Sequence, residues 1–450
     1  MNPASAASAS PAQTRNLLPL AGILNLNAGW FGLAYLWNGL HAILLPLIVA
    51  SLAPGALKAT TLGGLTFAGL MVAMLTQPIA GAISDRSGWL GRFGKRRPWM
   101  VLGSTVTVAL LLLMGLTGKL WLVVVVYTLM QFASAFTEAT LQGLLPDRVP
   151  SQQHGKASGY KNAFQIAGFV VGVGLGGYLA SRGQVEWALV VTAGVLAGTI
   201  AWTVLGVREQ PVRSVRRRAI SATGAVRALA ASFRIDRNVA PSYARLLAGR
   251  GFVMAGFFVL QSFAQYFVAD KLGVANPAGT TALLMAIMGA AIFLLAVPTG
   301  VLADRVGRRP LNLFSGVLGA AATTALIFVG NLPQLVVAGG LVGAAVGIFL
   351  SVNWAWAADM VPLEEAGRYL GLANIATAGA SAVARLLAGP LVDGGNLLRQ
   401  GAGYEILFLV LGLGMLFGVW LLSGVPETRS QPSQPMVDAI PVEQNDRGGS

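Results

Sequence analysis

The 450-residue chain contains no cysteine and only two histidines, His41 and His154. The lack of cysteine excludes disulfides and thiolate-bound metals, and two isolated histidines do not give a metal-ligand spacing. The sequence also lacks paired carboxylates within its apolar stretches and a nucleotide-binding loop. We therefore expect no metal, no other cofactor and no enzymatic activity.

Charged residues are scarce, at 11% of the chain, against about a quarter in soluble domains. Hydrophobic residues make up 55%, and the 57 glycines are typical of helices that pack closely in lipid. Twelve apolar stretches are long enough to cross a bilayer. They lie near residues 22–50, 60–84, 98–118, 120–145, 157–181, 185–206, 246–269, 278–302, 310–330, 333–358, 367–392 and 403–425. The sequence thus predicts an all-α membrane protein with twelve transmembrane helices.

The basic residues are distributed unevenly over the loops between these spans. On the side of the two termini lie 24 of the 31 lysines and arginines, and five lie on the opposite side: Lys58, Lys119, Arg182, Lys271 and Arg399. The positive-inside rule then places both termini in the cytoplasm and the protein in the inner membrane. The net charge of +14 sits in these loops, so the expected partners are membrane lipids and not nucleic acid.

The second half of the chain repeats the first. An offset of 212 residues maps Pro98 onto Pro310, Asp147 onto Asp359 and Asn162 onto Asn374, and an offset of 219 maps 81–86 onto 300–305. Because each half has an even number of spans, the two copies share one orientation in the membrane. We expect six-helix bundles at 21–206 and 244–426, a basic linker at 207–243, and disordered ends at 1–20 and 427–450.

Two loop segments carry a resemblance to a known family. Residues 300–309 read G-x-x-x-D-R-x-G-R-R, and residues 81–86 match the first half of that pattern. With two copies at corresponding loops, the chain resembles the major facilitator superfamily over about residues 20–425. Stretches 88–98, 144–150 and 359–368 resemble the branch of glycoside/cation symporters and sucrose-type carriers. The resemblance implies a carrier whose two bundles rock about a central site.

The same resemblance implies a gate at the cytoplasmic face. In the family, Asp85 and Asp304 would each lie near the N-terminus of a helix in the other half, where the helix dipole favours an anion. The nearby arginines would bridge to Asp147 and Asp359 and hold the inner side shut; alternatively, they only set the topology. The residues assigned to this gate are Gly81, Asp85, Arg86, Arg97, Asp147, Gly300, Asp304, Arg305, Arg309 and Asp359.

Glu138 is the only acidic residue deep within a predicted span. A charge at mid-bilayer costs roughly 2.5–3.5 kcal/mol on insertion scales, so such a residue suggests function. Tyr127, Gln131, Ser134, Glu138 and Gln142 are three or four residues apart and share one helix face. Three interpretations of Glu138 stay open. It takes up a coupling proton, it binds a hydroxyl or amine of the substrate, or it is the structural partner of Arg250 or another buried donor.

Polar and aromatic residues also mark four other spans. They are Tyr35 and Asn38; Gln261 and Gln265; Asn353 and Trp356; and Arg385. The resemblance implies that the first, fourth, seventh and tenth helices line the cavity, so these residues join Glu138, Tyr127 and Gln131 in the predicted pathway. Amides with flat rings suit a polyhydroxy solute, and equally an amphipathic drug. Arg385 is expected either to have a structural or gating role, by pairing with a carboxylate or carbonyl or by closing the outer side with Asp393, or to bind substrate. Arg250 is expected to reach the cytoplasmic surface.

We therefore expect a secondary active transporter that works by alternating access, as a monomer. The first-choice activity is proton-coupled uptake of a sugar or glycoside. The alternative is proton-driven efflux of small organic compounds or drugs. A membrane sensor that binds a solute without moving it is a hypothesis of another class.

Overall fold

The computed structural model describes residues 17–86, 93–207, 242–361 and 366–427, and gives only the backbone of residues 86, 151, 366–368 and 370. Most of the expected disordered ends and of the expected linker lies outside these ranges, although residues 17–20 and 427 are described and α1 already begins at Leu20. Twelve helices in the described ranges are long and apolar enough to cross a membrane, which confirms the predicted number. The same part of the chain contains no strand. The protein is thus an all-α, multi-pass membrane protein.

The first six spans form one bundle. They are Leu20–Leu52, made of α1 (Leu20–Gly39), the π-helical segment η1 (Leu40–Leu44) and α2 (Leu45–Leu52); α3 (Lys58–Arg86); α4 (Arg97–Gly115); α5 (Leu120–Arg148); α6 (His154–Ser181); and α7 (Val185–Gly206). The other six form the second bundle: α9 (Tyr243–Asp270), α10 (Pro277–Val306), α11 (Arg308–Ala325), α12 (Leu332–Asp359), α13 (Ala366–Leu398) and α14 (Ala402–Ser423). The predicted spans match these helices, although α13 continues six residues beyond the predicted end.

Local sequence explains several helix boundaries. Asn276 and Asn331 precede α10 and α12, and their side-chain oxygens accept the amide hydrogens of Gly279 and Gln334 at 2.9 and 3.0 Å. Each helix also has a proline in its first turn, where a missing N–H costs nothing. Gly307 separates α10 from α11 with φ +106°, a conformation that only glycine adopts readily.

The first span is not a uniform α-helix, because its backbone widens into a π-helix at Leu40–Leu44. Pro46 follows directly and has no N–H to give to the carbonyl of Ala42. A wide turn next to a proline leaves carbonyl groups free, and such π segments often mark functional positions. Apolar periodicity alone does not predict this feature.

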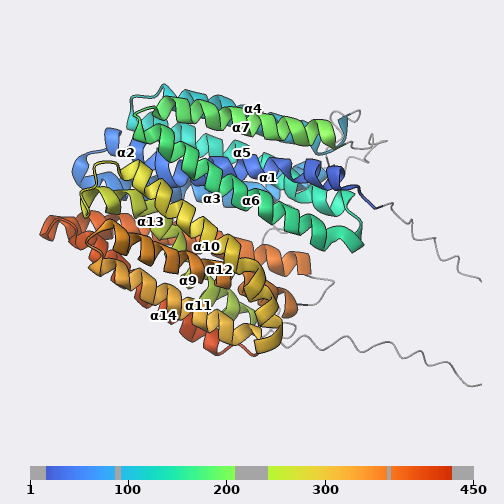
Figure 1. Cartoon of the computed structure of the whole chain (residues 1–450). Coiled ribbons are helices and arrows are strands. Elements are labelled where there is room, and N and C mark those ends of the chain that lie inside the picture. The colour runs from blue at the N-terminus through green and yellow to red at the C-terminus, as the bar shows by residue number, and fades with distance from the viewer. Residues whose placement is uncertain (1–16, 87–92, 208–241, 362–365, 428–450) are drawn as a thin grey trace, which may run out of the picture.

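The two bundles pack side by side (Figure 1), through α3 against α13 and α6 against α10. We call the side where α1 begins and α14 ends the tail side, and the opposite side the far side. At the α3–α13 crossing, a Cβ on Gly63 or Gly389 would collide with the backbone of the other helix. Small residues therefore let these two helices approach closely, as is common in membranes.

Candidate functional site

Five polar side chains form two hydrogen-bonded groups, one of which joins the bundles, and we call them the central polar cluster: Asn38, His41, Tyr127, Gln131 and Gln261. Gln131 Nε2 donates to Tyr127 Oη at 2.8 Å, and that hydroxyl lies 2.8 Å from Nε2 of His41. From the second bundle, Gln261 Nε2 donates to Asn38 Oδ1 at 2.9 Å. Trp37 stacks on the His41 ring. The sequence analysis assigned all but His41 of the cluster to the pathway, and the structure brings them together.

Gln265 and Tyr266 of α9 contact the π-helical segment from the opposite bundle. The Gln265 side-chain amide is oriented so that its nitrogen donates to the carbonyls of Ile43 and Ala42 at 3.0 and 3.2 Å. The Tyr266 hydroxyl donates to the Pro46 carbonyl at 2.9 Å. The second bundle therefore donates hydrogen bonds to carbonyl groups in and just after the widened turn.

Arg385 does not pair with Asp393, contrary to one of the two roles expected for it. Its Nε donates to Ser262 Oγ at 2.8 Å, and its Nη2 donates to the Phe258 carbonyl at 3.4 Å. The side chain is 3% exposed. Arg385 thus ties α13 to α9 inside the second bundle.

Glu138 lies on α5, half-buried, and Arg250 is not its partner. Gln77 of α3 lies beside its side chain, and Lys161 of α6 is close enough to interact with it electrostatically. The Lys161 ammonium also lies 3.9 Å from the centre of the Trp30 ring. The intramembrane carboxylate therefore faces a cation within its own bundle. The sequence analysis missed Lys161, which it counted only as a loop charge.

Arg250 does not reach the tail-side surface as expected, because its side chain is 4% exposed. Its Nη1 donates to Asn353 Oδ1 at 2.6 Å, and its Nε donates to Thr377 Oγ1 at 2.9 Å. The guanidinium also lies 5.3 Å from the centre of the Trp354 ring. These contacts join α9, α12 and α13 inside the second bundle.

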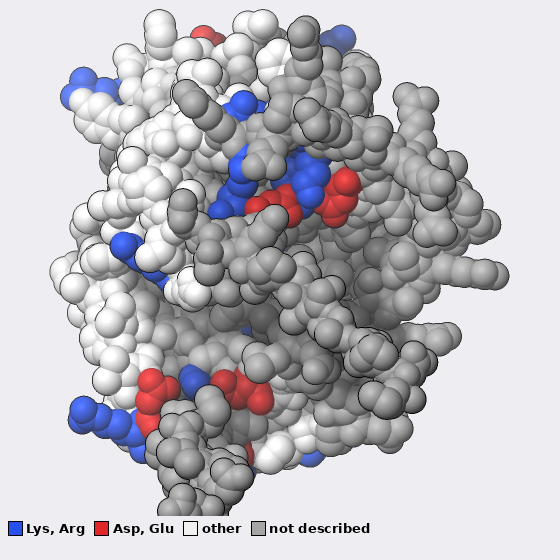
Figure 2. All heavy atoms as spheres, turned by 90° about the vertical axis from the view of Figure 1, so that its right-hand side faces the viewer, with Lys and Arg blue, Asp and Glu red and all other residues white. Residues whose placement is uncertain are grey.

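Two groups of charge lie on the tail side, one in each bundle (Figure 2). In the first charge triad, Arg96 binds Asp85 at 2.7 Å and Asp147 at 2.6 Å. In the second charge triad, Arg308 bonds to Asp359 and lies 3.5 Å from Asp304. Arg96 and Arg308 are repeat-related, 212 residues apart.

The bridging arginines Arg96 and Arg308 were not among the residues that the sequence analysis assigned to the gate. Arg97 and Arg309 come one residue after the bridging pair, and Arg309 instead bonds to the Ser423 carbonyl at the end of α14. Arg305 is exposed, and the side chain of Arg86 lies outside the described residues. Gly81 and Gly300 lie in the last turns of α3 and α10, as expected. Each triad ties helices of one bundle, whereas the expected gate joins the two bundles.

The hydrogen bonds and ion pairs that join the bundles, among the described residues, lie at the centre or on the far side. We call the far-side group the outer closure: Lys58, Asp270, Asp393 and Tyr404. Lys58 Nζ pairs with Asp270 at 2.6 Å, and the Tyr404 hydroxyl donates to the same carboxylate. Asp393 accepts the amide hydrogens of Ala59 and Thr60 at 3.3 and 2.7 Å, at the N-terminus of α3. An anion is favoured there by the helix dipole.

Two predicted pathway residues lie elsewhere. Tyr35 is buried inside the first bundle, where its hydroxyl lies near Thr192 of α7. Trp356 is fully buried, and its Nε1 donates to the Pro426 carbonyl at 3.2 Å, beyond the end of α14. Both residues have the predicted helix position but turn toward neighbours in their own bundle.

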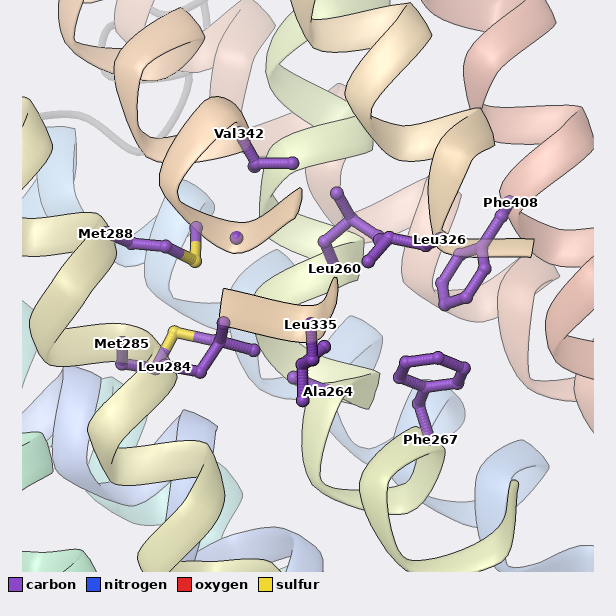
Figure 3. Close-up of a pocket in the computed structure, with 11 residues that line it drawn as sticks. Leu260, Ala264, Phe267, Leu284, Met285, Met288, Leu326, Leu335, Val342 and Phe408 are labelled. Carbon is purple, nitrogen blue, oxygen red and sulfur yellow. The ribbon is translucent and has the colours of Figure 1, made fainter. Parts of the chain in front are cut away.

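A small apolar cavity lies within the second bundle, between α9, α10, α12 and α14 (Figure 3). Its lining includes Leu260, Phe267, Met285, Met288 and Phe408. Without a polar group to orient a ligand, this cavity is a packing gap.

The fold and sequence can be compared with known proteins. The crystal structure of the nucleoside transporter NupG superposes with a TM-score of 0.69 at 14% identity, covering 89% of this chain and 98% of that one. A D-xylose-proton symporter-like protein of Arabidopsis thaliana is 28% identical over 200 residues, 42% of this chain and 34% of that protein. The multidrug resistance protein MdtG of Enterobacter lignolyticus (strain SCF1) is 25% identical over 407 residues, 87% of this chain and 90% of that protein.

These relatives do not confirm the narrower resemblance to glycoside/cation symporters and sucrose-type carriers. The sequence model of the Major Facilitator Superfamily matches residues 28–281 and 246–443, which together cover most of the chain. The chain therefore belongs to the Major Facilitator Superfamily, and it is a transporter and not an enzyme.

Proposed function

We propose that the protein expels small organic compounds from the cytoplasm in exchange for protons. The observation that carries the proposal is the similarity to MdtG, a multidrug resistance protein, because it spans 90% of that protein. The shorter match to a sugar symporter covers only 34% of its relative. The efflux hypothesis is thus supported over a larger part of the chain than the sugar-uptake hypothesis.

In this proposal both termini lie in the cytoplasm of a cell with an inner membrane. The excess of basic residues on the tail side supports that orientation. The outer closure would then face the periplasm, and the structure would correspond to an inward-facing state. An exporter in this state is ready to collect its compound from the cytoplasm.

Glu138 is the group we propose for the coupling proton. It is the acid deepest in the membrane, and a carboxyl held away from water binds a proton more readily. In the outward-facing state the carboxylate takes up a proton and loses its attraction to Lys161. In the inward-facing state the proton leaves to the cytoplasm, and the attraction between Glu138 and Lys161 returns.

The test uses everted membrane vesicles that contain the protein, with an acidic lumen. Exchange predicts that amphipathic fluorescent dyes accumulate in the lumen and that dissipating the pH gradient releases them. Radiolabelled xylose, inositol and sucrose serve as the comparison set, in right-side-out vesicles with an acidic exterior. Accumulation of a sugar there, with no movement of any dye in the everted vesicles, would reject the export proposal.

Sugar uptake is the second candidate, and the central polar cluster favours it. Its amides, hydroxyl and imidazole match the hydrogen-bonding groups that sugar hydroxyls need, and Trp37 offers a flat ring beside them. The right-side-out vesicles above decide between the two activities.

A further inference from the structure

Arg250 is a buried cation without a described anionic partner. It lies seven residues into α9, about 10 Å from the tail-side end of the helix, and is 4% exposed. Among the described residues, no carboxylate lies within 4 Å of its guanidinium. The acid at mid-membrane, Glu138, faces Lys161 in the other bundle. An uncompensated buried charge is costly, so this cation calls for an anionic partner beyond the described side chains.

Asn353 adds a second unsatisfied group at the same place. Its Oδ1 accepts from Arg250 Nη1 at 2.6 Å, while its Nδ2 is buried and has no hydrogen-bond partner. A buried donor left unpaired costs about 1–3 kcal/mol. Arg250 and Asn353 therefore present a cation beside a free N–H group, the combination that binds an oxyanion.

Trp354 provides an apolar surface beside these donors. Its ring centre lies 5.3 Å from the Arg250 guanidinium, and the side chain is 37% exposed. Leu350, one turn before it, is also 37% exposed. Leu341 is an exposed residue on the outer surface of α12. Leu350 comes nine residues later, about two and a half helical turns, and therefore lies on the opposite face of the helix. The Leu350–Trp354 edge thus faces away from the outer apolar surface of α12.

We propose that Arg250 and Asn353 bind the carboxylate of a transported aromatic acid, and that its ring packs on Trp354. The proposal rests on the export function and narrows its substrates to small organic anions with an apolar ring. Arg250 supplies the charge and Asn353 Nδ2 an additional hydrogen bond. Thr377 Oγ1 fixes the guanidinium from the side.

Binding of benzoate, 2-naphthoate and anthracene-9-carboxylate to the purified full-length protein tests this site. Each radiolabelled acid is compared with its uncharged primary amide by scintillation proximity. We expect at least one acid to bind at least tenfold more tightly than its amide. Asn353→Asp places a carboxylate beside Arg250 in nearly the same volume, so we expect it to lose this preference for the acid while amide binding changes less than twofold.

Arg245→Gln is the matched control, because Arg245 is an exposed arginine in the first turn of the same helix. It should leave the preference intact. Arg250→Gln should abolish the preference, and Arg250→Lys should retain part of it. Equal binding of acid and amide, no binding of any acid, or an unchanged preference in Asn353→Asp would each overturn the proposal. Dye export by the unmodified protein is measured separately, so failure of the anion site and failure of export are distinguishable.

Discussion

Glu138 combines two properties that a proton-coupling residue needs. It lies nine residues before Asp147, about 13 Å into the span, and it interacts with Gln77 and Lys161. Glu138→Gln keeps the size of the side chain and its contact with Gln77 but cannot take up a proton. We expect pH-driven accumulation to fall at least tenfold while exchange of substrate across the membrane stays within about twofold, as expected when coupling alone is lost. Transport assays in proteoliposomes measure both quantities.

The exposed acid Glu186 at the start of α7 offers the matched control. Glu186→Gln should transport like the unmodified protein. Normal accumulation by Glu138→Gln would remove Glu138 from the coupling role.

Arg96 holds three segments of the first bundle together with one side chain. It binds Asp85 at the end of α3 and Asp147 at the end of α5, and it begins the turn into α4. Arg96→Gln removes charged hydrogen bonds worth about 1.5–3 kcal/mol each before solvent screening. Because both aspartates are partly exposed, we expect a smaller total loss, about 1–3 kcal/mol. The melting temperature in detergent should fall by several degrees more than for Arg305→Gln, which changes an exposed arginine. Equal melting temperatures of the two variants would contradict this structural role.

The sequence does not predict which neighbour an individual side chain contacts. The repeat predicts that an arginine of each Arg-Arg pair meets Asp147 or Asp359, but not which of the two adjacent residues turns inward. Tyr35 and Trp356 show the same limit, because helical spacing gives the face of a residue and not the neighbouring helix that covers it. Lys161 was overlooked because its meeting with Glu138 requires the relative placement of α5 and α6.

At the scale of elements, the π-helical segment of the first span depends on the second bundle. Gln265→Leu removes the side-chain donor to the buried carbonyls of Ala42 and Ile43. We expect a loss of about 1–3 kcal/mol, seen as a lower melting temperature. Gln334→Leu changes an exposed glutamine at the start of α12 and should have little effect. Similar melting temperatures for the two variants would show that the contact contributes nothing to the closed far side.

Most helix positions follow from the sequence, because a span needs a long apolar stretch and its ends carry recognisable signals. Asn276-Pro277 and Asn331 with the following Leu-Pro mark two of these starts, and Gly307 marks a break. The widening at Leu40–Leu44 has no such signal, since Pro46 alone is compatible with an ordinary bend. Its satisfaction by Gln265 is a tertiary contact between segments more than 200 residues apart.

For the whole molecule, alternating access requires that each closed side be stabilised by contacts that the other state lacks. The described contacts between the bundles favour the state in which the far side is closed. Asp393 is central to that state, because it is 7% exposed and holds two amide hydrogens at the N-terminus of α3. Its contact crosses between the bundles and is lost if they separate on the far side.

Asp393→Asn should therefore shift the protein toward the state that opens on the far side. Loss of charged hydrogen bonds and of the helix-dipole interaction, together about 1.5–3 kcal/mol, corresponds to a roughly 10- to 100-fold change in the ratio of the two states.

The natural chain has no cysteine, so spin labels attach only to introduced cysteines. Lys156→Cys with Arg305→Cys reports the tail side, and Leu116→Cys with Leu398→Cys reports the far side. In double electron–electron resonance, Asp393→Asn should shorten the tail-side distances and lengthen the far-side distances. Glu405→Gln is the control, because Glu405 pairs with Lys271 and Arg399 inside the second bundle. Unchanged distances in Asp393→Asn would show that the outer closure does not set the balance between the states.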